Sequence, residues 1–67
     1  MSISITLNGQ EKMIDDKTTV LDILREQGGT RRVAVYVNGE QWLQSDYDIR
    51  YFSSGDQVKI IRIFSGG

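Results

Sequence analysis

The chain has 67 residues, of which 39% are hydrophobic and 25% charged, and eight Lys and Arg against nine Asp and Glu give a formal net charge of −1. This length predicts one domain, close to the lower limit at which a single hydrophobic core can hold a fold, and the composition is that of a globular protein. The basic residues are scattered along the sequence. The sequence therefore lacks the concentrated positive charge with which proteins bind nucleic-acid phosphates.

The residue types that are missing exclude several kinds of chemistry. The sequence has no Cys and no His, which excludes disulfides, thiolate nucleophiles, Cys-based metal sites and the most common general base. Its acidic residues lie in polar stretches, where solvated carboxylates are far commoner than catalytic pairs: Asp15 with Asp16, Asp46 with Asp48, and Glu40. We therefore expect no autonomous enzyme and no metal site.

The sequence also predicts a cytoplasmic protein. Its first residues alternate polar with apolar and lack the basic and apolar regions of a signal peptide. No stretch approaches the ~20 apolar residues that a membrane span needs. The absence of Cys suits a reducing compartment.

The first elements in chain order are a β-hairpin. Polar and apolar residues alternate from Ser2 to Leu7, which is typical of a strand with one buried face. Asn8-Gly9 then suits a tight turn in which both central residues have positive φ. A return strand follows over Gln10 to Ile14, but the adjacent apolar pair Met13 and Ile14 leaves its register open.

One short helix is predicted next. Apolar residues at positions 20, 21, 23 and 24 form a helical stripe that needs the face of a sheet to pack against. Thr19 is placed to cap the first amides, Asp22 stands three residues later as in a capping box, and Gly28 suits a left-handed helix end.

The second half of the sequence predicts further strands. Val33, Val35 and Val37 occupy alternate positions, and Asn38-Gly39 ends this run as Asn8-Gly9 ended the first. Trp42-Leu43 predicts a short edge strand, whereas 45–50 has too little periodicity for a regular element. A turn at 53–56 leads into the most hydrophobic run, Gln57 to Phe64.

The order β-β-α-β-(β)-β predicts an α+β domain with a mixed sheet of four to five strands and one main helix packed on one face. The β-grasp (ubiquitin-like) roll fits this order. We expect residues 1–64 to form the domain and residues 65–67 a flexible tail.

The last predicted strand has apolar residues on both faces. Val58 and Ile60 would point to one side of the sheet, and Lys59, Ile61 and Ile63 to the other. Two explanations are open. Either a bulge near Ile60 and Ile61 shifts the register, or the helix-free face is an apolar surface that a partner covers.

The chain ends in Ser65-Gly66-Gly67. Terminal glycines can be an incidental frayed end. Here, however, a hydrophobic strand runs directly into two residues without Cβ, which allow close approach to another surface. Three extended residues at ~3.3 to 3.6 Å each would carry the Gly67 carboxylate roughly 10 Å into a partner's cleft.

Several of these segments together resemble a known family, the small ubiquitin-like sulfur carriers of the ThiS and MoaD type, and the thiamin-pathway ThiS family above all. The similarity extends over essentially the whole chain and is carried by Thr19-Val20 with Ile23-Leu24, 33–40 (Val-Ala-Val-Tyr-Val-Asn-Gly-Glu), Gly55-Asp56-Gln57-Val58 and terminal Gly66-Gly67. One stretch departs from it. After Asn-Gly-Glu many thiamin-type carriers continue with an apolar residue, proline and arginine, but here the sequence is Gln-Trp-Leu-Gln-Ser at 41–45.

The resemblance implies that the carboxylate of Gly67 is the working group. A partner adenylyltransferase of the ThiF or MoeB type would activate it with ATP, and a sulfur donor such as a cysteine desulfurase would supply the sulfur of a thiocarboxylate. Thiazole synthase, of the ThiG type, would be the sulfur acceptor. The carrier would bind no cofactor and be a co-substrate of these enzymes. We expect Ile61, Ile63 and Phe64, with Tyr36 beside them, to dock the adenylyltransferase.

Other functions stay open. The chain could be a carrier for another pathway, such as molybdopterin synthesis or amino-acid or tRNA thiolation. It could also be a ubiquitin-like modifier joined through Gly67 to lysines, or a β-grasp binding module whose terminal glycines are incidental.

Overall fold

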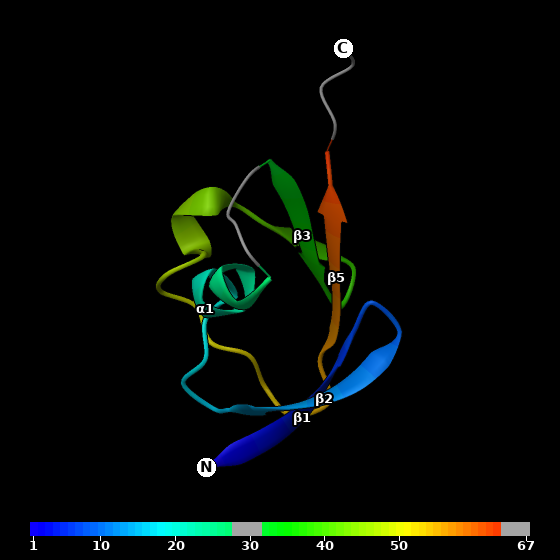
Figure 1. The fold of residues 1–67 in the computed structure, drawn as a ribbon, viewed down its shortest axis with the longest axis vertical. Helices are drawn as coiled ribbons and strands as arrows, with labels where there is room; N and C mark the ends of the chain where they lie inside the picture. Colours follow the sequence, from blue (N-terminus) through cyan, green and yellow to red (C-terminus); the bar gives the residue numbers. More distant parts are fainter. Residues whose placement is uncertain (28–31, 64–67) are drawn as a thin grey trace.

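The computed structural model describes residues 1–27 and 32–63. These form two layers, a five-stranded sheet and a helix that covers one of its faces (Figure 1). The elements are β1 (Ser2–Leu7), β2 (Gln10–Asp15), α1 (Val20–Glu26), β3 (Val33–Val37), β4 (Glu40–Trp42), the 3-10 helix η1 (Gln44–Asp46) and β5 (Gln57–Arg62). The strand order is β2-β1-β5-β3-β4; β1 and β5 are parallel and the other pairs antiparallel. The expected α+β, β-grasp class with a mixed sheet is confirmed.

The core lies between α1 and the sheet. Val20, Ile23 and Leu24, from the predicted helical stripe, are buried. They join one cluster with alternate residues of the strands, namely Ile5, Leu7, Ile14, Val35, Val37, Trp42, Val58 and Ile60, and with Phe52. Each strand thus turns one set of alternate side chains toward the helix.

The predicted capping box is present at the start of α1. Thr19 Oγ1 accepts a hydrogen bond from the Asp22 amide at 3.3 Å, and Asp22 Oδ2 accepts one from the Thr19 amide at 3.1 Å. At the other end the Gln27 amide donates to the Ile23 and Leu24 carbonyls. Gly28, predicted to end the helix, lies outside the described residues.

Both Asn-Gly turns have the predicted backbone. The φ angles are 49° and 84° at Asn8 and Gly9, and 54° and 84° at Asn38 and Gly39. The register left open in the first hairpin pairs Ile3 with Ile14. Ile14 consequently packs in the core, while Met13 lies on the opposite face, 63% exposed.

The edge of the sheet differs from the prediction. The strand predicted at Trp42-Leu43 is Glu40–Trp42, and Leu43 lies outside it, 60% exposed. The Leu43 amide donates to Asp46 Oδ2 at 3.1 Å, so this residue begins η1 instead of continuing the ladder.

An aromatic stack secures β4 where the sequence departs from the ThiS pattern. The rings of Trp42 and Phe52 stack with centroids 5.3 Å apart, and the Arg50 guanidinium lies 4.2 Å from the centre of the Trp42 ring. Arg50 also pairs with Glu40 at 3.7 Å. Cation–π contact and ring stacking thus fix this edge in a segment without proline.

Within the described part of the chain, no helix is long and apolar enough to cross a membrane. No group of three or more acidic side chains among the described residues is arranged to hold a metal ion.

Candidate functional site: the helix-free face of β3 and β5

β5 is the central strand of the sheet, and its two faces differ. Val58 and Ile60 are 1% and 8% exposed, whereas Ile61 and Ile63 are 50% and 52% exposed. The first pair packs under α1, and the second lies on the face that the helix does not cover. Each of the two adjacent isoleucines, Ile60 and Ile61, therefore has a different environment.

No bulge causes this difference. Pairing between β5 and β3 is continuous, from Val58 opposite Val37 to Arg62 opposite Val33. The ladder continues one residue further, since the Ile63 amide donates to the Arg32 carbonyl at 3.0 Å. The bulge explanation is wrong for this part of the strand, and the apolar face is real. The strand itself is shorter than predicted, ending at Arg62.

Apolar side chains of β3 and β5 lie close together on this face, with Ala34 among them buried. Ala34 lies opposite Ile61, and Tyr36 lies opposite Lys59. Such directly opposed residues on one face have neighbouring side chains. Ala34, Tyr36, Ile61 and Ile63 are called the helix-free patch below.

The Asn8 side chain binds the middle of β5, on the side of the strand opposite β3. β1 pairs with β5 only at Thr6 with Gln57 and Leu7 with Val58. Beyond that, the Asn8 side chain replaces a strand: its Oδ1 accepts from the Ile60 amide at 2.9 Å and its Nδ2 donates to the Ile60 carbonyl at 3.3 Å. The polar groups of β5 are thus satisfied next to the patch by a side chain.

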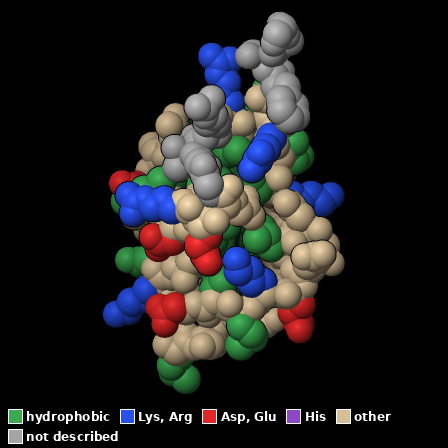
Figure 2. Space-filling model, viewed as in Figure 1, with side chains coloured by type: hydrophobic (Ala, Val, Ile, Leu, Met, Phe, Trp, Pro, Cys, Tyr) green, Lys and Arg blue, Asp and Glu red, His purple; other side chains and the backbone are tan. Residues whose placement is uncertain are grey.

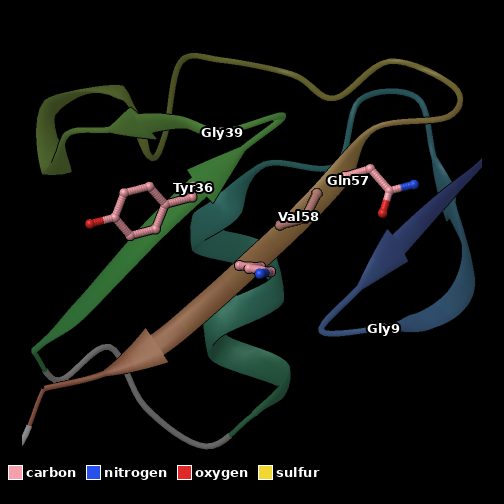
Figure 3. A pocket seen from close by; sticks show the side chains of 6 residues that line it. Gly9, Tyr36, Gly39, Gln57 and Val58 are labelled. Atoms are coloured by element: carbon pink, nitrogen blue, oxygen red, sulfur yellow. The ribbon is translucent and has the colours of Figure 1, made fainter.

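A shallow groove of about 370 Å³ continues the patch toward the two Asn-Gly turns. Figure 3 shows Gly9 and Gly39 at two sides of it, with Tyr36 on β3 and Gln57 on β5. Lys59 and the Val58 segment complete the lining. The groove was not predicted from the sequence, although Lys59 occupies the same set of alternate positions on the last strand as Ile61 and Ile63.

Charge is distributed unevenly over the surface. Figure 2 shows basic side chains at the end of the molecule where β5 finishes and over the rest of this face, whereas the acidic side chains in view lie away from that end. Arg32 and Arg62 are exposed at this end, and Lys59 is exposed on the same strand as Arg62. Two basic residues farther from this end form ion pairs, Lys12 with Glu26 and Arg50 with Glu40.

Comparison with known proteins settles which family this geometry belongs to. The model of the ThiS family matches residues 5–67. The chain belongs to the ThiS family. The crystal structure of a thiamine biosynthesis protein (ThiS) from Geobacter metallireducens matches with a TM-score of 0.77 and 25% sequence identity, over 97% of this chain and 100% of that chain. No curated protein sequence matches.

In this ThiS-family chain, the structure brings together only some of the residues predicted to act. Tyr36, Ile61 and Ile63 lie on one face of the β3–β5 pair, with Ile61 and Ile63 toward the end of β5 and Tyr36 toward its start. Phe64, Ser65, Gly66 and Gly67, and with them the predicted boundary between domain and tail, lie outside the described residues. By sequence, Gly67 follows Ile63 by four residues, so the expected working group is close along the chain to the helix-free patch.

Proposed function

We propose that this protein is a sulfur carrier in thiamin biosynthesis, with the α-carboxylate of Gly67 as the group that is activated and loaded. The observation that carries the proposal is the ThiS-family match, which includes the two terminal glycines. The similarity to a thiamine biosynthesis protein over the whole of that chain supports it.

The chemistry assigns each step to a partner. A carboxylate is a poor electrophile until it gains a leaving group. In the proposed reaction, a Gly67 carboxylate oxygen attacks the α-phosphorus of ATP on an adenylyltransferase of the ThiF or MoeB type, and pyrophosphate leaves. The terminal sulfur of a persulfide on a donor such as a cysteine desulfurase then attacks the acyl carbon and displaces AMP, which gives an acyl disulfide. A second thiol of a partner attacks this disulfide at the sulfur of the donor, so that the thiocarboxylate leaves and a disulfide remains between the two thiols. The resulting thiocarboxylate gives its sulfur to a thiazole synthase of the ThiG type.

The residue inventory fits a carrier of this kind. The chain has neither Cys nor His, so the nucleophile and general base belong to the partners. ATP is likewise bound by the adenylyltransferase. The chain supplies a folded domain that the partners bind and a narrow C-terminal segment.

The helix-free patch is the proposed surface by which the adenylyltransferase binds the folded domain. Ile61 and Ile63 are half exposed beside Tyr36, and exposed apolar groups in a contiguous set are typical of a surface that binds another protein. Phe64, next in sequence, is included in the proposal.

The test changes the length of the tail. Each variant is mixed with the cognate adenylyltransferase, ATP and a sulfur source, and intact mass is measured for replacement of one oxygen by sulfur. Adding one alanine after Gly67, or deleting Gly67, should abolish loading, because it moves the carboxylate by about 3.3 to 3.6 Å. Gly66→Val should be nearly as damaging, since a β-branched side chain widens the tail and restricts its backbone.

The melting temperature serves as the control. All three variants should melt within about 2 °C of the wild type, because terminal residues contribute little packing. Normal thiocarboxylate formation at the end of the lengthened chain would contradict the role of Gly67. Mass spectrometry of whole-cell extracts distinguishes a sulfur carrier from a protein modifier. A modifier would appear as covalent adducts on lysines of other proteins.

A further inference from the structure

The helix-free patch has basic residues at two of its borders. Lys59 lies on β5 between Gln57 and Ile61 and directly opposite Tyr36. Arg32 precedes β3, and its carbonyl accepts the hydrogen bond from the Ile63 amide. By strand alternation both side chains lie on the face of Tyr36 and Ile61. An apolar centre is thus flanked by a cation toward the turns and a cation toward the chain end.

Nothing within the described residues neutralises these two cations. Neither Lys59 nor Arg32 has a carboxylate within 4.0 Å among them. The nearest acidic residue in sequence to Lys59 is Asp56, and its carboxylate is already engaged by the Ser53 amide at 2.8 Å and the Asn38 side chain at 3.0 Å. The positive charge beside the patch is therefore available to a partner.

The groove provides a place for the opposite charge. It is lined by Lys59, the Gln57 amide side chain and Tyr36, and bounded by two glycines that project no side chain into it (Figure 3). A Cβ at Gly9 or Gly39 would meet no other atom within 4 Å, so the space beside both turns is open. A side chain of a bound protein can approach Lys59 here without displacing any part of the fold.

From this arrangement we infer that the protein which covers the helix-free patch presents carboxylates at the border of an apolar surface, and that one of them occupies the groove beside Lys59. The inference rests on the proposed function and describes the chemistry of its adenylyltransferase partner. Arg32 takes a second carboxylate at the opposite border of the patch.

The physical role of these contacts is to orient and speed docking. Charges at the border of an interface raise the association rate and fix the relative orientation of the partners, and they penalise partners with like charge. A nucleic acid would also be attracted by positive charge, but its bases stack on aromatic side chains, whereas the exposed residues Ile61 and Ile63 are aliphatic. The patch favours a protein.

The test compares two exposed lysines that have no carboxylate within 4.0 Å in the described structure, Lys59 and Lys17. Lys17 follows β2 near the start of β1, away from the end of β5. Binding to the adenylyltransferase of the same organism is measured by surface plasmon resonance at about 0.05 M and 0.5 M salt. Lys59→Glu should weaken binding at least about tenfold at low salt, Lys59→Gln less, and Lys17→Glu no more than about twofold. The association rate of the wild type should fall as salt rises.

Circular dichroism of each variant checks that the fold is retained. If Lys59→Glu does not fold, the binding of Lys59→Gln and the salt dependence of the wild-type association rate test the role of Lys59 instead. Equal binding by the Lys59 and Lys17 variants, or a wild-type association rate that salt does not change, would overturn the inference. Failure of the wild type to form a thiocarboxylate would overturn the proposed function instead, whereas normal loading with unchanged binding by Lys59→Glu removes only the role of charge.

Discussion

Ile60 and Ile61 are neighbours in one strand and identical in chemistry, yet the first is 8% exposed and the second 50%. Ile60 packs in the cluster beneath α1, and Ile61 lies on the face that no element among the described residues covers. The comparison shows that a hydrophobic residue in a strand need not belong to the core. The position of the single helix decides which face holds the fold and which is free for binding.

The two faces differ in what they contribute to the free energy of unfolding. A fully buried aliphatic side chain contributes about 1.5 to 3 kcal/mol relative to exposure, so Val58 and Ile60 stabilise the domain directly. Ile61 and Ile63 retain half of their exposure and contribute much less. Their hydrophobic energy remains available for association.

Truncation of each isoleucine should separate these roles most clearly. Ile60→Ala should lower the free energy of unfolding by about 2 to 5 kcal/mol, since it leaves a cavity in the core. Ile61→Ala should lower it by less than about 1 kcal/mol and instead weaken binding to the adenylyltransferase. Urea denaturation and titration calorimetry measure the two effects. Comparable losses of stability in both variants would mean that the two faces are not distinct.

The helix itself can be weakened without touching either face of the sheet. Thr19→Ala removes the acceptor for the Asp22 amide, and we expect a loss of ~1 kcal/mol in the free energy of unfolding. Thr18→Ala is the matched control, because Thr18 precedes the cap and its side chain makes no hydrogen bond to another described residue. Thermal unfolding measures both. A larger loss for Thr18→Ala would place the cap one residue earlier, and a loading defect in Thr19→Ala at unchanged stability would be unexpected.

The smallest expected effect is at Asp15, at the end of β2 and far from both faces of β5. A hydrogen bond from the Lys17 amide at 2.9 Å is the largest cause that holds the pKa of the Asp15 carboxyl below its ordinary value. Because the folded-state pKa is lowered, the ionised Asp15 carboxylate stabilises the folded state at neutral pH. This contribution to the free energy of unfolding is lost as the pH falls below the ordinary aspartate value through the folded-state pKa.

Carboxyl chemical shifts followed by NMR against pH give this measurement. Asp15 should titrate below the ordinary aspartate value, and Asp15→Asn should leave the stability at neutral pH almost unchanged because the carboxyl is exposed to solvent. A titration midpoint at or above the ordinary value would show that the Lys17 bond does not persist in solution.

Local rules recovered most of the elements of this chain. The two Asn-Gly turns need positive φ at both residues, and Thr19 with Asp22 satisfies the first helical amides, so neighbouring residues alone fix these features. Two boundaries could not be predicted in this way. Leu43 leaves its strand because the Asp46 carboxylate captures its amide, and the register of Met13 and Ile14 depends on which face meets the helix.

Some features of the candidate site could likewise be predicted from the sequence, and others could not. The alternation of Val58, Ile60, Ile61 and Ile63, and the glycines at the end of the chain, could be seen in the sequence, since side-chain direction in a strand follows from backbone geometry. The choice between a bulge and an exposed apolar face required the continuous pairing of β5 with β3. The groove, and the place of Lys59 within it, depend on two turns separated by some thirty residues of sequence being brought to the same strand. That proximity is created by the parallel pairing of β1 with β5 and the antiparallel pairing of β3 with β5, and only the tertiary structure decides it.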